Sequence, residues 1–313
     1  MIGYIIRRIM ATIPVVLVVA VFIFSLLFLT PGDPAAVIAG DTASPADIQR
    51  IRENLGLERP FLIQFGEWMW NVLQGNLGNS VFTGLPVSRM IMQRIEPTLS
   101  LTFLTMVLSV LVAVPLGVFA AWRNGTTIDR SIMALAVLGF SVPVFVVGYS
   151  LAYIFALELG WLPVQGYVPI ARGIDRWFLS LILPSLALGS VYIALIARTT
   201  RATMLEVLQQ DYVRTATAKG LRPLQVLFVH SLRNAAVPVI TVIGIGFTLL
   251  ISGAVVTETV FGIPGLGRLT VDAVLQRDYP VIQGVVLLFS VLYVLINLLI
   301  DITYTLVDPR ISY

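Results

Sequence analysis

Six long apolar stretches, separated by shorter polar segments, constrain this chain more than any other feature of its sequence. A helix needs about 20 apolar residues to cross the hydrocarbon core of a bilayer, and each stretch meets that length. Only 12% of the 313 residues are charged, which is about half the share found in soluble globular domains. We therefore predict an all-α integral membrane protein with about six transmembrane helices, at Ile9–Thr30, Thr98–Trp122, Ile132–Leu157, Phe178–Ala197, Ala236–Thr257 and Val281–Tyr304.

The distribution of basic residues predicts the orientation of these helices. Arg7 and Arg8 precede the first stretch, and the segment 198–234 carries six Lys and Arg residues against Glu206 and Asp211. Short cytoplasmic loops are enriched in Lys and Arg. Both termini and the segment 198–234 are therefore expected on the cytoplasmic side of a bacterial plasma (inner) membrane. The chain has no contiguous basic run, so we do not expect nucleic acid as a partner. The net charge of +3 is attributed instead to the Lys and Arg bias of loops in a protein whose partner is the lipid bilayer.

Several classes of function lack the residues they need. The chain has no cysteine and a single histidine, His230, which has no neighbouring ligands or triad partners, so neither a metal, a cofactor nor a catalytic triad is expected. A Gly-x4-Gly-Lys-Ser/Thr phosphate loop is also missing, so ATP hydrolysis would need another polypeptide. The interiors of the second, third and fifth expected spans contain no ionisable residue, which disfavours a secondary carrier or a proton pump.

Small residues and prolines predict how the spans pack and bend. Ala113 and Gly117 are four residues apart, as are Ser185 and Gly189, a spacing typical of helices that approach one another closely. Pro143 and Pro115 are expected to kink the third and second spans.

The first external segment, residues 31–94, is expected to hold two short amphipathic helices. Ser44 and Pro45 have the pattern of a helix start, a capping hydroxyl followed by proline. A second helix is expected between Pro60 and Gln74. One alternative is a helix that lies on the bilayer surface; the other is a docking or gating surface made by Ile48, Ile51, Leu55, Phe65 and Trp68.

The segment 198–234 is too polar to span a membrane and too regular to be an unstructured loop. Asp211 can cap a short helix over Val213–Lys219, and Gly220 is suited to end it. Pro223 can then start a returning helix. This arrangement would present basic residues to a cytoplasmic partner.

The same segment resembles the coupling loop of permeases of ATP-binding-cassette (ABC) importers. The general motif there is Glu-Ala-Ala, three residues, Gly, nine residues and Ile-x-Leu-Pro. Aligned on Gly220, this chain has Arg214-Thr215-Ala216 at the first three places, and His230, Leu232 and Arg233 stand at the Ile, Leu and Pro. This variant is similar to that of the dipeptide/oligopeptide/nickel (and glutathione) transport family. Further resemblances to that family occur along the chain, at Thr30–Pro34, Leu55–Leu57, Gly75–Ser80, Gly262–Arg268, Arg277–Pro280 and Asp308–Arg310.

The resemblance implies a type I ABC importer permease fold. Its parts would be a first transmembrane helix (1–30), an extracytoplasmic segment (31–94), a five-helix core (95–304) with the coupling loop, and a cytoplasmic tail (305–313). The residues implied in coupling to the ATPase are Asp211, Tyr212, Arg214, Thr215, Ala216, Lys219, Gly220, His230, Arg233 and Asn234.

The resemblance also implies partners and a function. The partners would be a second homologous permease subunit, two cytoplasmic ABC ATPase subunits and an extracytoplasmic solute-binding protein. Together they would import di- or oligopeptides, with no enzyme activity in this subunit. The alternatives are import of glutathione, nickel chelates or opine-like solutes by the same fold, or a stand-alone channel or secondary carrier.

The predicted orientation can be tested by labelling. Because the chain has no cysteine, Arg214→Cys and Ser44→Cys each introduce a single thiol, on opposite sides of the membrane in the six-span model. A membrane-impermeant maleimide applied to intact spheroplasts should label Ser44→Cys alone, and applied to inside-out vesicles it should label Arg214→Cys alone. Labelling of both sites from one side would contradict the model.

Overall fold

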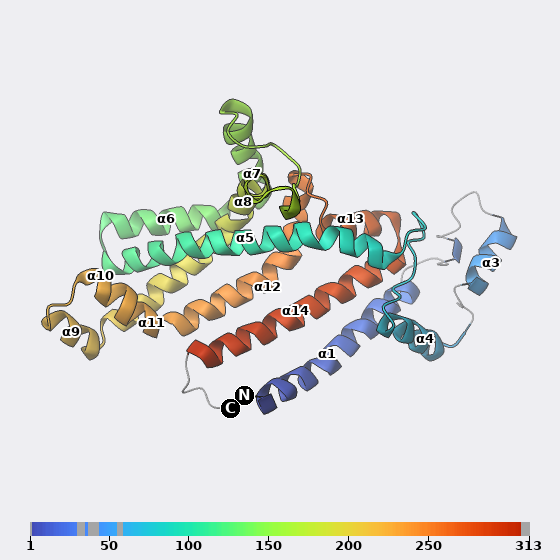
Figure 1. The fold of residues 1–313 in the computed structure, drawn as a ribbon, viewed down its shortest axis with the longest axis horizontal. Coiled ribbons are helices and arrows are strands. Elements are labelled where there is room, and N and C mark those ends of the chain that lie inside the picture. Colours follow the sequence, from blue (N-terminus) through green and yellow to red (C-terminus); the bar gives the residue numbers. More distant parts are fainter. Residues whose placement is uncertain (1, 30–34, 37–43, 55–58, 308–313) are drawn as a thin grey trace. The chain divides into compact units, whose positions relative to one another are not determined.

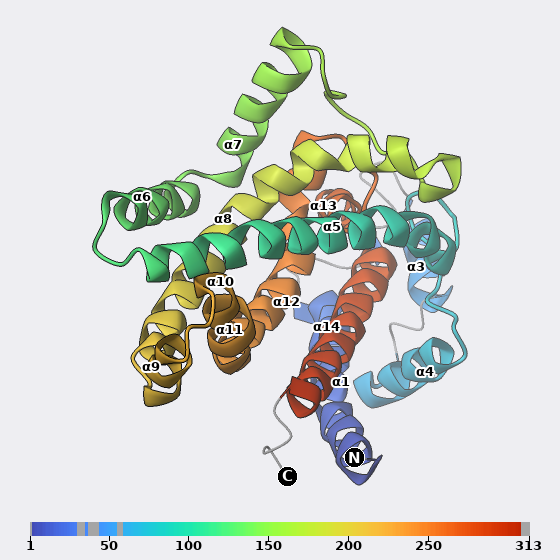
Figure 2. The ribbon, with the colours of Figure 1, turned by 60° about the vertical axis from the view of Figure 1, so that its left-hand side comes forward.

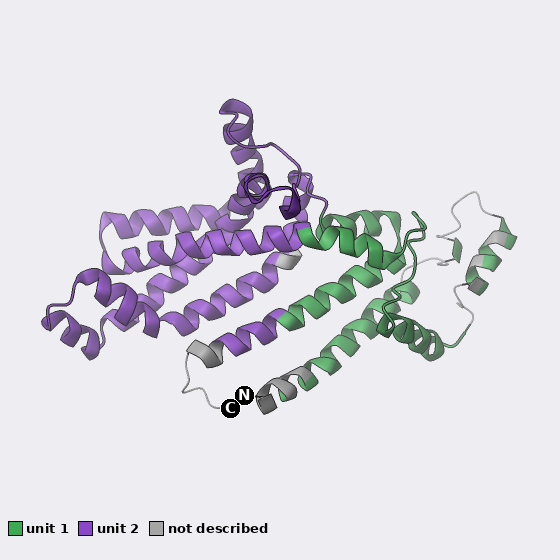
Figure 3. Cartoon of the chain, in the orientation of Figure 1, with its two compact units in different colours: residues 1–96, 265–295 green, residues 97–264, 296–313 purple. Residues whose placement is uncertain are grey.

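The computed structural model describes residues 2–29, 35–36, 44–54 and 59–307; the described residues form helices joined by turns and contain no β-strand (Figure 1). They pack as two compact units, one of residues 1–96 with 265–295 and one of residues 97–264 with 296–313 (Figure 3). Four helices are long and apolar enough to cross a membrane, and two bent helix pairs bring the number to as many as six. The prediction of an all-α membrane protein with about six spans is confirmed.

Three helices meet in the core of the first unit. The nearly inaccessible core side chains come from α5 (Val87–Trp122), α13 (Leu266–Gln276) and α14 (Tyr279–Val307): Val87, Ile91, Leu266, Leu269, Ala273, Val281 and Val285. Gly284 permits the close approach, since a Cβ there would lie 2.7 Å from Cγ1 of Val87. The sequence analysis missed α13, because its 11 residues are too few and too mixed in polarity to resemble a span.

Aromatic side chains fasten the external helix α4 (Phe61–Leu73) to α1 (Ile2–Leu29) within the first unit. The ring centroid of Phe24 lies 5.6 Å from that of Phe65 and 5.4 Å from that of Trp68. Phe65 and Trp68 are therefore half-buried against α1. Their docking role stays a prediction, and in this structure α1 covers part of the surface that docking would use.

The helix predicted after Ser44 is present as α3 (Pro45–Asn54). The amide of Ile48 donates to the carbonyl oxygen of Ser44 at 3.1 Å, as expected at a helix start. The side chain of Ile48 is half-buried. Leu55 and the side chain of Ile51 lie outside the described residues.

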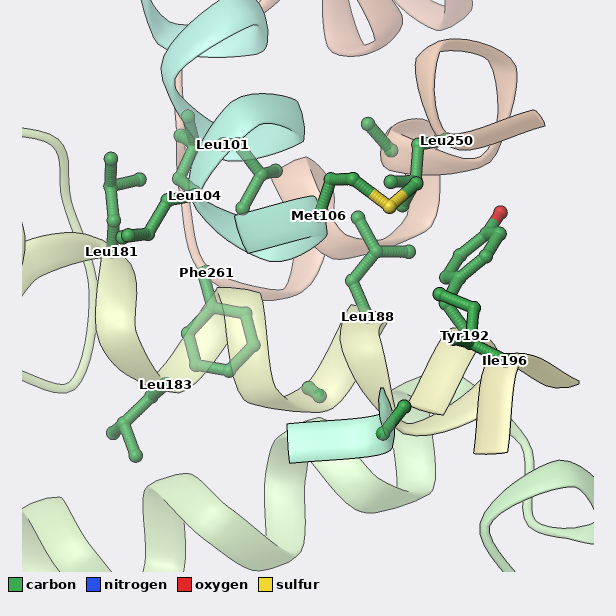
Figure 4. Close-up of a cluster of buried hydrophobic side chains, with 14 of the residues drawn as sticks. Leu101, Leu104, Met106, Leu181, Leu183, Leu188, Tyr192, Ile196, Leu250 and Phe261 are labelled. Carbon is green, nitrogen blue, oxygen red and sulfur yellow. The ribbon is translucent and has the colours of Figure 1, made fainter. Parts of the chain in front are cut away.

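The second unit is organised around α8 (Ile174–Leu208), which contacts α6 (Thr127–Ser141), α7 (Val144–Leu151) and α12 (Ala236–Val260) (Figure 1 and Figure 2). Between these helices lies a cluster of buried apolar side chains that includes Leu101, Leu188 and Leu250 (Figure 4). The shorter elements of this unit are η1 (Ala152–Glu158), η2 (Ile170–Arg172), α9 (Asp211–Ala218), α10 (Pro223–Gln225), η3 (Val226–Ser231) and α11 (Leu232–Asn234).

The third expected span, Ile132–Leu157, is not one helix. The structure breaks it into α6 and the pair α7–η1, which meet at an angle of 104°. Pro143 precedes α7, and Val142 adopts an extended backbone conformation, as the residue before a proline prefers. The proline therefore ends α6 rather than kinking a continuous span, whereas α5 runs on through Pro115.

The predicted close packing at small residues is confirmed in the second unit. A Cβ on Gly117 would lie 2.6 Å from Cβ of Thr200 and 2.7 Å from the carbonyl oxygen of Ala197. A Cβ on Gly189 would lie 2.9 Å from Oγ of Ser109. Neither position has room for a larger residue, so α5 and α8 touch along their length.

An ionisable residue, Glu258, lies just beyond the fifth expected span. The helix continues past Thr257 to Val260, so Glu258 lies inside α12 and is fully buried. The hydroxyl of Thr98 on α5 donates to Oε1 of Glu258 at 2.6 Å. This contact joins residues 160 positions apart and gives the buried carboxyl group a hydrogen-bond donor within the protein.

Two of the short sequence phrases, Gly75–Ser80 and Arg277–Pro280, meet in the first unit. The hydroxyl of Ser80 donates to Oδ2 of Asp278 at 2.5 Å, and the amide of Val81 donates to Oδ1 at 3.2 Å. Ser80 and Asp278 are 2% and 3% exposed. The buried carboxylate therefore holds the 75–86 loop against the connection between α13 and α14.

Removing this carboxylate should loosen the loop. In Asp278→Ala the Ser80 hydroxyl and the Val81 amide lose their acceptor, which costs about 1–3 kcal/mol for each group left unsatisfied. Proteolysis within residues 75–86 should be faster than in the wild type, measured in detergent. Asp272→Ala, which removes a less buried carboxylate of α13, should be cleaved at the wild-type rate. Equal rates for Asp278→Ala and wild type would show that other contacts hold the loop.

Candidate coupling site

The segment that follows α8 forms a short helix with one buried side chain. The helix α9 begins at Asp211, after an extended Gln210, and contacts both α8 and η3. Val213 is 4% exposed and anchors the helix, whereas Tyr212 is 42% exposed. The short helix predicted here is present and presents most of its side chains outward.

The predicted N-cap is wrong in detail. Asp211 is the first residue of α9. The N-cap position is occupied by Gln210, whose side chain makes no capping hydrogen bond. An acidic residue in the first turn still stabilises the helix through its dipole. Nη1 of Arg214 lies 3.8 Å from Oδ1 of Asp211, and both side chains are largely exposed. Such a pair contributes little to stability.

The end of α9 is a Schellman turn, as the position of Gly220 predicted. Gly220 has φ = +80°. Its amide donates to the carbonyl oxygen of Thr217 at 3.0 Å, and the amide of Leu221 donates to that of Ala216 at 3.4 Å. Two orphan carbonyls of the helix are thereby satisfied, and only glycine adopts this backbone without strain.

The returning segment starts at Pro223, as predicted, and includes a π-helical turn. The amide of Arg222, just before this segment, donates to Oε1 of Gln225 at 3.3 Å. The following residues form η3, a π-helix that carries His230. Leu227 is buried, together with Met204 of α8 and Val118 and Ala121 of α5. The segment is therefore packed firmly against the end of α8.

The ten residues implied in coupling fall into two groups in the structure. The first group lies on α9 and its terminal turn and is exposed except for the half-buried Ala216: Asp211, Tyr212, Arg214, Thr215, Ala216, Lys219 and Gly220. The second group is exposed on the returning segment, where the side chain of Asn234 donates to the carbonyl oxygen of His230 at 2.8 Å and Arg233 lies between them. Contacts between α9 and η3 bring the two groups to one end of the second unit.

Sequence reasoning missed a contact between this end of α8 and the turn after α5. Nε of Arg201 donates to Oδ1 of Asp129 at 2.5 Å, and Nη2 donates to Oδ2 at 2.8 Å. The two residues are 72 positions apart, and the sequence analysis counted Arg201 only among the basic residues of the segment 198–234. No signal in a single sequence pairs them.

Comparisons with known proteins agree with this geometry. The model of the family described as binding-protein-dependent transport system inner membrane component matches residues 113–313, and a model of the N-terminal part of such membrane components matches residues 1–102. A probable peptide ABC transporter permease protein of Sinorhizobium fredii (strain NBRC 101917 / NGR234) is 58% identical over 99% of each chain. A glutathione transport system permease protein of Pectobacterium atrosepticum is 47% identical over 100% of each chain.

A solved structure shows the same fold. A chain of the MetNI methionine ABC transporter in an inward-facing conformation is 17% identical, with a TM-score of 0.58 over 70% of this chain and 96% of that chain. The fold and the exposed helix after α8 thus define a multi-pass permease subunit of an ABC importer. The chain belongs to the family of binding-protein-dependent transport system inner membrane components, which confirms the resemblance found in its sequence.

The Schellman turn gives a matched pair of substitutions. Gly220 and Gly160 both have positive φ angles, +80° and +63°, and a Cβ at either position would meet nothing within 4 Å. Valine at either site therefore costs only backbone strain, about 1–2 kcal/mol, and both variants should insert and accumulate. Only Gly220→Val should reorient α9. Substrate uptake by the reconstituted transporter should fall for Gly220→Val and stay near wild type for Gly160→Val. Equal uptake by the two variants would show that this turn has no part in coupling.

Proposed function

We propose that this chain forms half of the translocation pathway of an ATP-driven importer of di- or oligopeptides. Its partners are a second homologous permease subunit, two cytoplasmic ABC ATPase subunits and an extracytoplasmic solute-binding protein. This subunit contributes the pathway and the coupling surface, and the ATPase subunits contribute the hydrolysis. The observation that carries the proposal is the exposed face of α9, held at one end by a Schellman turn and from beneath by Val213.

The chemistry of this face fits an ATPase groove with acidic residues. Arg214 and Lys219 are exposed on α9, and Arg233 is exposed on the returning segment. Among the described residues the charge of Arg214 is hardly used, since its pair with Asp211 is long and exposed. Guanidinium and ammonium groups that are free to reorient can form charge-assisted hydrogen bonds with a partner's carboxylates. Tyr212 adds an aromatic contact of the kind enriched in protein interfaces.

The location of the subunit follows from its charge bias. We place it in the bacterial plasma membrane, with both termini and the segment 198–234 in the cytoplasm. The parts named from the sequence, a first helix, an external segment, a five-helix core and a tail, belong to this proposal. The external residues Ile48, Ile51, Leu55, Phe65 and Trp68 are proposed to support docking of the solute-binding protein. For Phe65 and Trp68 that support is indirect, through holding α4 on α1.

Peptides are the favoured substrates because of the relatives' names. The Sinorhizobium fredii relative is named a probable peptide permease, and a Brucella abortus relative, 46% identical over the whole of both chains, is named a putative peptide transport system permease. The Pectobacterium atrosepticum relative is named for glutathione. Glutathione import is therefore the second candidate, since glutathione shares amide bonds, an α-ammonium group and a C-terminal carboxylate with peptides.

Reconstitution separates these functions. Vesicles that contain this subunit with its partner permease, ATPase subunits and solute-binding protein should import labelled trialanine only when ATP is enclosed on the ATPase side. Labelled glutathione offered in place of trialanine should be imported more slowly if peptides are the substrates and faster if glutathione is. Import by this subunit alone, without ATP, would establish a channel or carrier and overturn the proposal.

A milder substitution tests the coupling surface. Arg214→Ala should weaken copurification of the ATPase subunits by a few-fold, and the loss should deepen at high salt because the remaining exposed charges are screened. Arg172→Ala, an exposed cation on the short helix η2 before α8, serves as the control and should copurify like the wild type. Equal copurification of Arg214→Ala and wild type at every salt concentration would remove Arg214 from the interface.

A further inference from the structure

Arg201 and Asp129 form the most completely satisfied charged contact described in the second unit. Asp129 is 3% exposed and accepts from Nε and Nη2 of Arg201 at 2.5 and 2.8 Å. The amide of Gly125 also donates to Oδ2 of Asp129, at 2.9 Å. Nη2 of Arg201 donates further to Oδ1 of Asn124, at 3.0 Å. One guanidinium thus joins α8 both to the start of α6 and to the turn between α5 and α6.

The contact lies close to α9 along the chain. Arg201 lies seven residues, about two turns, before the end of α8 at Leu208, and α9 starts at Asp211. A planar guanidinium bound at two atoms fixes direction as well as distance. The contact therefore ties α6 to the part of α8 that lies next to α9.

Close packing extends the connection along the same three helices. Gly117 of α5 lies against Thr200 and Ala197 of α8, and a Cβ on Gly139 of α6 would lie 3.1 Å from the carbonyl oxygen of Ser190. These contacts leave no room for the helices to slide past one another. The break at Val142–Pro143, by contrast, lies immediately beyond α6.

We propose that Arg201 and Asp129 are a positioning pair that locks α6 and the α5–α6 turn to α8, so that α9 displaces the three helices as one rigid body. The inference rests on the proposed coupling function of α9. Neither residue contacts substrate or nucleotide. The pair determines how much of the movement of α9 arrives at the break before α7.

The competing explanation is that the pair only keeps a buried charge satisfied. Removing one partner of a buried ion pair is destabilising, whereas replacing both with apolar residues of similar size is often tolerated. A stability role thus predicts recovery in Asp129→Leu/Arg201→Met. A role of Arg201 in charge bias alone predicts full function in Arg201→Lys, since lysine keeps the charge but not the two-point contact.

The test compares import with ATP hydrolysis in the complete reconstituted transporter. The variants are Arg201→Lys, Asp129→Asn and the apolar pair, and the control is Arg198→Lys, an exposed arginine one turn away on α8. We expect the variants to copurify with the ATPase subunits and to hydrolyse ATP. Their import of labelled trialanine per ATP hydrolysed should fall by about tenfold or more, since tenfold is the lower end of what one hydrogen bond to a charged group contributes to an equilibrium. Arg198→Lys should keep the wild-type ratio.

Each outcome decides between the explanations. Wild-type import per ATP in Arg201→Lys, or full recovery in the apolar pair, would overturn the positioning role. If the single variants fail to accumulate, the apolar pair carries the decision: low import per ATP at wild-type accumulation supports the proposal. The inference alone would be overturned if Gly220→Val lost import and Arg214→Ala lost ATPase binding while the variants at Arg201 and Asp129 behaved like the wild type. No effect at Gly220 and Arg214 would sink the coupling function itself.

Discussion

The bilayer interior offers no hydrogen-bond partner to a backbone amide or carbonyl, and the rest of this structure depends on that constraint. Long helices satisfy their own backbones, so only side chains and helix ends remain to be satisfied. The buried Glu258 is satisfied by the hydroxyl of Thr98, which lies 2.6 Å from its carboxylate oxygen. Arg201 serves Asp129. Because Glu258 and Asp129 each have a partner on another helix, these contacts also help to decide which helices are neighbours, a role that apolar side chains cannot fill in a solvent as apolar as they are.

Small residues supply what polar contacts cannot, which is extended contact between helices. Gly117 and Gly189 bring α5 and α8 together at two levels, where dispersion over many atom pairs replaces the missing hydrophobic drive. Rigidity is the consequence, because helices in such contact cannot move independently. The regular α-helical backbone is interrupted elsewhere, at the extended Val142 before Pro143 and at the π-helical turn η3. The second unit therefore combines a stiff group of helices with breaks at its ends.

The predictable features of this chain are those encoded locally. Apolar length predicted the spans, and the residues around Gly220 predicted the turn that ends α9, because one backbone angle decides the choice. The failures have a common cause. The size of the bend at Pro143 depends on what α6 and α7 pack against, and α13 is a helix because Leu266 and Leu269 are buried in a core made by distant segments. Pairings such as Arg201 with Asp129 exist only in three dimensions, so single-sequence reasoning could not find them.

The helix α9 is informative because it is too short to be stable alone. With eight residues, α9 falls below the length at which isolated helices persist in water, about 12–15 residues. Its helicity therefore depends on Val213 packing inward and on the Schellman turn at Gly220. The orientation of α9 must then follow that of α8 and η3, which hold it. The same dependence works in reverse, since linkage between two sites is reciprocal: a partner that fixes α9 in one orientation favours the arrangement of α8 that suits it. In the proposed function, α9 would therefore transmit a signal in either direction without any large rearrangement of its own.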